Sequence, residues 1–173
     1  MGKNIILVGF MGTGKSVTGR IVANQLEREF IDMDSLIEER AGKKISEIFA
    51  DEGEAHFRSL ERALVQELSA REDLVIATGG GIVLNPDNIS DFSKTGVVIC
   101  LHADPDTILK RVAKDSHRPL LEGDDDKIKA IRALLAKRDK LYQAIPLQIE
   151  TSNHTARETA QEVVALYLGQ TRF

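Results

Sequence analysis

A glycine-rich segment near the start of the chain, GFMGTGKS (residues 9–16), places a lysine and a serine directly after a glycine. Its Gly9, Gly14, Lys15 and Ser16 meet the spacing G-x-x-x-x-G-K-[ST], between the apolar run NIILV and a helical pattern. Glycines let successive backbone N–H groups point into one concavity, and a helix that begins there adds its positive end. The segment is predicted to hold a nucleotide's phosphates, with Lys15 reaching the β- and γ-phosphates and Ser16 ligating Mg²⁺.

Two aspartates stand two residues apart in DMD (residues 32–34), where a second strand pattern ends. In an extended chain, side chains i and i+2 face the same way, and doubly wound sheets bind ligands at the carboxyl ends of their strands. We expect Asp32 to help hold Mg²⁺ and Asp34 to accept a proton from an acceptor hydroxyl, as a general base does. The alternative is that Asp34 is only the N-cap of a helix starting at SLIEER.

Three later segments carry chemically useful residues, although each has an ordinary structural interpretation. FRSLE places Arg58 and Glu61 at i and i+3 on one helix face, which is typical of a surface salt bridge. The consecutive glycines of TGGG (residues 78–81) are costly in backbone entropy and make sense where a ligand touches the main chain. RDKLY places Arg138 and Tyr142 at i and i+4 of a late helix.

These residues need a scaffold, and short β-branched runs alternate with helical patterns along the chain. Strands are predicted over residues 4–9, 30–34, 73–78, 96–102 and 147–151. Helices are predicted over residues 15–28, 34–41, 45–70, 86–94, 104–114, 125–143 and 154–169. Asp104 before Pro105, and Asn85 before Pro86, are typical N-caps. Several strands are apolar without alternation, so the fold class is α/β, with a doubly wound five-stranded parallel sheet flanked by helices on both faces.

The segment KDSHRPLLEGDDDK (residues 114–127) interrupts this alternation between two helices. It is polar, contains Arg118, and is interpreted either as a mobile lid over a site or as a solvated loop. No linker or internal repeat divides the chain. We therefore expect a single domain over residues 1–173, with the lid inserted at about 114–127.

Composition excludes several classes of partner. The net charge is −4 with no long basic block, so no nucleic-acid partner is expected. No apolar stretch approaches the ~18 residues of a membrane helix, so no membrane partner is expected. The single cysteine, Cys100, lies in an apolar run and is interpreted as a small buried hydrophobe. Because the first strand pattern begins at Asn4, no signal peptide is expected, and we predict a reducing cytoplasm.

Taken together, these residues resemble the shikimate kinase family over essentially the whole chain. The segments GFMGTGKS, DMD, GKKISEIFADEGEAHFRSLE, TGGG, RPLL and RDKLY stand in the family's order. The third segment is the most specific, through Ile45, Ile48, Phe49, Gly53, Glu54, Phe57, Arg58 and Glu61. The resemblance implies a monomeric P-loop kinase with a mobile lid. Such an enzyme uses ATP and Mg²⁺ to phosphorylate the 3-hydroxyl of shikimate, on the route to chorismate and aromatic amino acids.

The resemblance also implies individual roles. Asp34, Arg58, Gly80 and Arg138 match shikimate-binding positions, with Gly79 and Gly81 beside them. Ser16 and Asp32 match the magnesium-associated positions. The implied nucleotide-binding residues are Gly12, Thr13, Gly14, Lys15, Ser16, Val17, Arg111, Arg118 and Asn153. The implied catalytic residues are Lys15, Asp34 and Arg118, the last being the lid arginine that contacts the transferring phosphate.

Three other functions remain as alternatives. A gluconate-type kinase has a similar loop, but its PLxDxDRxPWL-like segment is missing here. A nucleoside monophosphate kinase needs a pocket for a second base, and this chain is 5% aromatic with no tryptophan. A non-catalytic ATP-sensing module usually loses the base or the magnesium ligand, whereas this chain keeps Asp32, Asp34, Lys15 and Ser16.

Overall fold

The computed structural model describes residues 2–114 and 125–171, and its centre is one parallel sheet. The five strands are β1 (Asn4–Val8), β2 (Glu29–Asp32), β3 (Leu74–Ala77), β4 (Gly96–His102) and β5 (Leu147–Glu150). Their order in the sheet is β2-β3-β1-β4-β5, so the chain leaves the central β1 toward one edge and later crosses to the other. This reversal leaves a crevice for ligands beyond the carboxyl ends of the strands. The predicted doubly wound sheet is confirmed.

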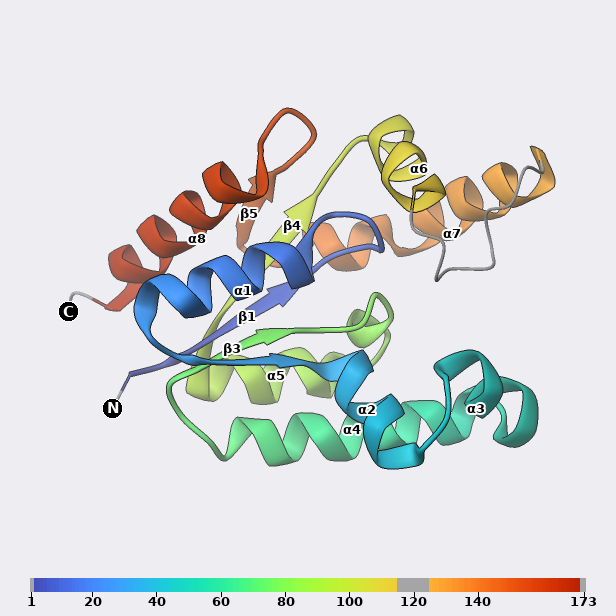
Figure 1. Ribbon diagram of the computed structural model, residues 1–173, viewed down its shortest axis with the longest axis horizontal. Coiled ribbons are helices and arrows are strands. Elements are labelled where there is room, and N and C mark those ends of the chain that lie inside the picture. The colour runs from blue at the N-terminus through green and yellow to red at the C-terminus, as the bar shows by residue number, and fades with distance from the viewer. Residues whose placement is uncertain (1, 115–124, 172–173) are drawn as a thin grey trace.

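Helices cover both faces of the sheet (Figure 1). The helices are α1 (Lys15–Leu26), α2 (Met33–Ala41), α3 (Ile45–Glu52), α4 (Glu54–Ser69), α5 (Pro86–Thr95), α6 (Pro105–Ala113), α7 (Asp125–Gln143) and α8 (Ala156–Thr171), with the short 3₁₀ helix η1 (Ile82–Leu84). In Figure 1, α1 and α8 lie on one side of the sheet, and α4 and α5 lie on the other.

The two faces have separate hydrophobic cores, and β1 contributes to both because successive side chains on a strand point to opposite faces. Ile5 and Leu7 pack with residues of α1 and α8 in one core. Ile6 and Val8 pack with residues of α4, α5 and α7 in the other. Every residue of β1 is buried. Its sequence is therefore almost entirely apolar and does not alternate between apolar and polar residues.

Local signals fixed several helix boundaries. The Asp104 side chain accepts a hydrogen bond from the Thr107 backbone N–H at 2.9 Å, and Asn85 accepts one from Asp87 at 3.0 Å. Both predicted N-caps are therefore confirmed. The prediction of one helix over residues 45–70 is wrong, because the helix is interrupted at Gly53, between α3 and α4. Gly53 has φ +86°, a left-handed value that favours glycine.

The DMD segment also differs from its prediction. The strand β2 ends at Asp32, and Met33 already begins α2, so Asp32 and Asp34 do not share one face of a strand. The alternative interpretation, with Asp34 as the N-cap, is wrong as well. Asp32 is the cap, and its Oδ1 accepts a hydrogen bond from the Ser35 N–H at 3.1 Å.

Two interpretations based on composition can be compared with the structure. Cys100 is fully buried in β4, and burial raises the pKa of its thiol to about 11, so its interpretation as a buried hydrophobe is confirmed. Across residues 2–114 and 125–171, no helix is long and apolar enough to cross a membrane.

Candidate active site

The phosphate loop (residues 9–16) joins the central strand β1 to α1, at the carboxyl edge of the sheet. Gly12 and Gly14 have φ values of +76° and +92°, which side chains rarely adopt. Gly14 is the N-cap of α1 and supplies no side-chain hydrogen bond to the first turn. The N–H groups at the start of α1 can therefore serve an anion.

Lys15 lies against this loop. Its Nζ donates hydrogen bonds to the carbonyl oxygens of Gly9 at 2.7 Å and Phe10 at 2.9 Å, and the residue is 9% exposed. Thr13 is buried, and its hydroxyl donates to the Phe10 carbonyl at 2.8 Å. The ammonium group of Lys15 has the positive charge that would bind a phosphate, whereas the Thr13 hydroxyl forms a hydrogen bond within the loop itself. The Val17 side chain is 53% exposed.

Ser16 and Asp32 are brought together where α1 begins and β2 ends. The Ser16 hydroxyl donates to Asp32 Oδ2 at 2.5 Å, while Asp32 Oδ1 caps α2. Both are oxygen donors, the type that Mg²⁺ prefers, and Mg²⁺ is usually held by one or two protein groups together with water and phosphate. Among the residues described by the structure, no group of three or more His, Cys, Asp or Glu side chains could hold a metal. The pair therefore fits a magnesium ion that takes most of its ligands from nucleotide and solvent.

A second group of side chains surrounds the glycine segment Gly79–Gly81, which follows β3. A Cβ added at Gly79 would lie 2.6 Å from Asp34 Oδ1, and the Arg58 guanidinium occupies the space that a Cβ at Gly81 would need. At Gly80, a Cβ would lie 3.9 Å from Arg138 Nη1. Helices α2, α4 and α7 thus bring Asp34, Arg58 and Arg138 to one stretch of backbone. The close approach of Asp34 and Arg58 explains why two of these three positions are glycine.

Glu61 is a buried carboxylate in the same cluster, whereas its spacing from Arg58 had been interpreted as a surface salt bridge. Its side chain is 2% exposed, so the surface interpretation is wrong. Arg58 Nη1 donates to Glu61 Oε1 at 3.0 Å. Burial raises the pKa of Glu61, and the positive charge of Arg58 opposes that rise. A signal was present in the sequence, because Glu61 falls on the apolar stripe of α4 between Phe57 and Leu64.

The contact with Glu61 orients the Arg58 side chain but leaves part of its guanidinium exposed. Its side chain is 25% exposed, and a weaker contact of 3.4 Å joins its Nη2 to Glu54. Its Nε is buried without a hydrogen-bond partner in the described part of the chain. A guanidinium held at one end by Glu61 and still one quarter exposed is suited to bind the carboxylate of a ligand.

Arg111, from α6, lies beside the phosphate loop on the side of β5. Its guanidinium donates to the Gly12 carbonyl at 3.3 Å, to the Thr151 hydroxyl at 3.0 Å and to the Thr151 carbonyl at 2.6 Å. The buried Thr151 hydroxyl lies 3.2 Å from the Thr13 carbonyl. Asn153 is exposed in the turn that follows. The family resemblance had placed the segment TSNHT (residues 151–155) near the adenine, with Asn153 singled out. The contact of Thr151 with the phosphate loop was not predicted, because no local pattern marks a contact across 138 residues.

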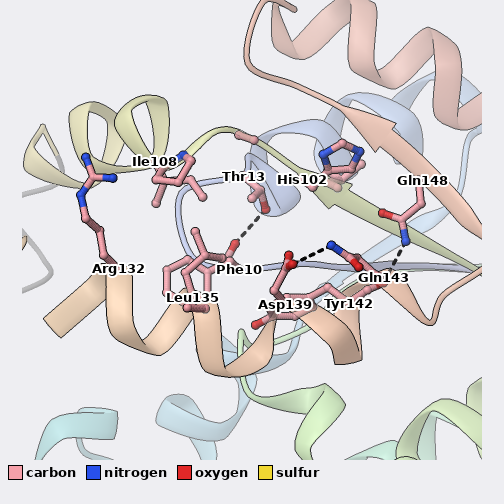
Figure 2. Close-up of a pocket in the computed structure, with 14 residues that line it drawn as sticks. Phe10, Thr13, His102, Ile108, Arg132, Leu135, Asp139, Tyr142, Gln143 and Gln148 are labelled. Carbon is pink, nitrogen blue, oxygen red and sulfur yellow. Dashed lines mark hydrogen bonds between the residues drawn. The ribbon is translucent and has the colours of Figure 1, made fainter. Parts of the chain in front are cut away.

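A cavity of about 680 Å³ lies between the phosphate loop, the end of β4, α6 and α7 (Figure 2). Thr13 lines it, but Asp34, Arg58 and Arg138 do not. Phe10 and Tyr142 line this cavity. The Tyr142 hydroxyl donates a hydrogen bond to the Gly80 carbonyl at 2.5 Å. The Tyr142 side chain therefore lies between the cavity and the glycine segment.

One group of predictions cannot be placed. Arg118 and residues 115–124, which make up most of the lid predicted over about 114–127, lie outside the described residues.

The phosphate loop and the polar cluster share the carboxyl edge of one parallel sheet, where a bound nucleotide's phosphates would face whatever the guanidinium groups hold. This arrangement defines the class: a P-loop phosphotransferase that acts on a small anionic acceptor. The family model for shikimate kinase matches residues 11–167. The chain belongs to the shikimate kinase family, whose members use ATP as the phosphoryl donor.

Individual relatives agree with this assignment. The shikimate kinase of Caldanaerobacter subterraneus subsp. tengcongensis is 47% identical over 166 residues, which cover 96% of each chain. A structure of shikimate kinase from Acinetobacter baumannii in complex with shikimate aligns with a TM-score of 0.90 at 38% identity, over 100% of this chain and 97% of that one. A gluconokinase from Sinorhizobium meliloti aligns with a TM-score of 0.64 at 13% identity, over 97% and 93% of the two chains. That likeness shows the shared fold alone, so the gluconate alternative is not favoured.

Proposed function

We propose that this protein transfers the terminal phosphoryl group of ATP to the 3-hydroxyl of shikimate, giving shikimate 3-phosphate and ADP. The observation that carries the proposed site is the meeting of Asp34, Arg58 and Arg138 at the glycine segment. Shikimate has one carboxylate and three hydroxyl groups. Two guanidinium groups complement the carboxylate, and one carboxylate side chain complements a hydroxyl.

The donor end of the site is the phosphate loop. Its N–H groups and the N-terminus of α1 hold the phosphates, with Gly12, Thr13, Gly14 and Val17 contributing backbone. Lys15 gives up its bonds to the Gly9 and Phe10 carbonyls and turns its ammonium group to the β- and γ-phosphates. Arg111 and Asn153 border the adenine. The ammonium group thus exchanges neutral carbonyl partners for charged phosphate oxygens, which are the stronger acceptors.

Ser16 and Asp32 would hold Mg²⁺ through the two oxygens that now bond to each other. When bound, the ion supplies positive charge to the β- and γ-phosphate oxygens. Asp32 keeps its second oxygen on the Ser35 N–H, so its carboxylate stays oriented by the start of α2.

At the acceptor end, Arg58 and Arg138 bind the carboxylate of shikimate from different helices. Glu61 holds Arg58 from its buried side, which fixes the direction of the guanidinium before the acceptor arrives. The Gly79–Gly81 backbone lets the ring approach closely. Binding in this way sets the distance and direction of the reacting hydroxyl, and positioning is the main source of rate in phosphoryl transfer.

Asp34 acts as the base. It accepts the proton of the 3-hydroxyl as that oxygen forms a bond to the γ-phosphorus, while the bond from phosphorus to the ADP oxygen breaks. Lys15 and Arg118 stabilise the charge on the transferring group. We further propose that residues 1–173 act as one domain, with a lid at about 114–127, and that the protein is a cytoplasmic monomer.

The test is ADP release measured in a coupled assay with ATP and Mg²⁺ and with shikimate, gluconate, CMP or no acceptor. Stimulation by shikimate alone is expected, and ³¹P NMR of the product should show the 3-phosphate ester. Asp34→Asn should abolish the stimulation while ATP still binds. Equal stimulation by gluconate or CMP, or ADP release that no acceptor increases, would contradict the proposal.

A further inference from the structure

Tyr142, near the end of α7, is a buried residue to which the mechanism above gives no role. It is 5% exposed and is held at three points. Its backbone carbonyl accepts a hydrogen bond from Gln148 Nε2 of β5 at 2.8 Å. Its ring meets Phe10 of the phosphate loop edge-on, with 6.4 Å between centroids and 81° between planes. Its hydroxyl donates to the Gly80 carbonyl at 2.5 Å.

These contacts join parts of the site that are far apart in the sequence. Figure 2 shows Tyr142 on α7 with Phe10 close by and the amide of Gln148 directed to it. The bond to Gly80 spans 62 residues. One rigid side chain therefore touches the loop proposed for the donor and the backbone proposed for the acceptor, one helical turn from Arg138 on the same helix.

The phenol is suited to act as a permanent donor. Burial raises the pKa of Tyr142, with the Arg138 charge acting in the opposite direction. The hydroxyl thus keeps its proton at neutral pH, and the Gly80 carbonyl, which has no proton to give, must be the acceptor.

Gly80 needs such an anchor more than its neighbours do. The Asp34 carboxylate and the Arg58 guanidinium crowd Gly79 and Gly81, whereas a Cβ added at Gly80 would meet nothing nearer than the Met11 nitrogen at 3.6 Å. Glycine backbone is the most costly to order, and a fixed aromatic donor orders it with a single bond.

We propose that Tyr142 is a positioning residue for the acceptor: by holding the Gly80 carbonyl and packing on Phe10, it sets the acceptor-binding backbone at a fixed distance from the phosphate loop. This inference rests on the function proposed above. Tyr142 does not touch the reacting atoms. Its loss should weaken shikimate binding and leave the chemical step intact.

The first test is steady-state kinetics of Tyr142→Phe, which keeps the ring and removes the hydroxyl. The KM for shikimate should rise about 3- to 10-fold, the range for one hydrogen bond. The kcat and the KM for ATP should stay within about twofold of wild type, because the ring still packs on Phe10. A purely structural role would lower the melting temperature without this selective change in KM.

The chain offers a matched control in its other tyrosine. Tyr167 of α8 is also 5% exposed, and its hydroxyl accepts a hydrogen bond from Arg28 Nη2 at 2.8 Å. It belongs to the core on the opposite face of the sheet from Tyr142. Tyr167→Phe should cost comparable stability and leave both KM values unchanged. An equal rise in the shikimate KM of both variants would overturn the inference.

The second test needs no variant that alters the site. The chain has two tyrosines, so protein labelled with 3-fluorotyrosine gives two ¹⁹F resonances, which Tyr167→Phe assigns. Saturation with shikimate should shift the Tyr142 resonance and leave that of Tyr167 in place. This measurement decides the matter even if Tyr142→Phe does not fold.

The outcomes separate the two proposals. Wild-type protein that does not phosphorylate shikimate would contradict the proposed function itself. Active wild type with an unchanged shikimate KM in Tyr142→Phe, or with a Tyr142 resonance that shikimate does not move, would overturn the role of Tyr142 alone.

Discussion

The Arg58 guanidinium donates to the Glu61 carboxylate at 3.0 Å, one turn along α4, and the Glu61 side chain is 2% exposed. An acidic side chain this deeply buried needs a charged or hydrogen-bonding partner. Arg58 supplies that partner, and its guanidinium lies against the glycine segment at Gly81. The pair thus links the packing of α4 to the orientation of the guanidinium that is proposed to bind the acceptor.

The pH dependence of stability should report on Glu61. Because the pKa of Glu61 is raised in the folded state, the folded protein binds more protons than the unfolded chain from about pH 4.5 up to that raised value. Stability therefore falls as the pH rises through this window. In Glu61→Gln this contribution is absent, so calorimetry from pH 4.5 upward should show a smaller loss of melting temperature than in wild type. Parallel curves would contradict the assignment.

Gly80→Ala should separate binding from folding. A Cβ at this position makes only ordinary contacts, so the melting temperature should stay within about 2 °C of wild type. The added methyl group would stand where the acceptor approaches, and the KM for shikimate should rise about tenfold or more. Gly169→Ala on α8, where a Cβ meets nothing within 4 Å, is the control and should leave KM unchanged. A variant with normal shikimate affinity would remove Gly80 from the site.

Asp32→Asn should distinguish the two tasks of Asp32. Asparagine caps a helix about as well as aspartate, so the cap on Ser35 and the stability should survive. The lost negative charge should raise the Mg²⁺ concentration for half-maximal activity about tenfold, as measured by magnesium titration of the ADP-release assay. An unchanged magnesium requirement would show that Asp32 is only a cap.

Arg118→Ala addresses the residue that lies outside the described part of the chain. Turnover should fall about 10³-fold, the lower end for an arginine that stabilises the transferring phosphoryl group. Shikimate affinity, measured by calorimetric titration without nucleotide, should be nearly intact. Near-normal turnover would refute the role inferred from the family resemblance.

The fold could be predicted because its signals are local. The apolar run Asn4–Val8, the glycines of the phosphate loop and the caps at Asn85 and Asp104 each depend on neighbouring residues. The break at Gly53 was missed because both flanking segments are helical and one glycine within such a pattern is often tolerated.

The parts of the site that escaped prediction depend on contacts between distant residues. Tyr142 was unremarkable at i+4 from Arg138, and its bond to Gly80 becomes visible only once α7 is packed against η1. Thr151 contacts the phosphate loop across 138 residues. The glycines of Gly79–Gly81 were explained by ligand access alone, whereas the structure adds the close approach of Asp34 and Arg58.

The most direct test of the central claim, that Arg58 and Arg138 bind one carboxylate, is a double-mutant cycle on kcat/KM for shikimate. Arg58→Ala and Arg138→Ala should each lower it about 10- to 100-fold, mainly through KM. Arg62→Ala is the control, since Arg62 lies on α4, is 25% exposed like Arg58 and pairs with Asp91 at 2.6 Å. The double variant should be less impaired than the product of the two single effects, because both side chains contact the same group. Strictly multiplicative losses, or an unchanged shikimate KM in either single variant, would contradict it.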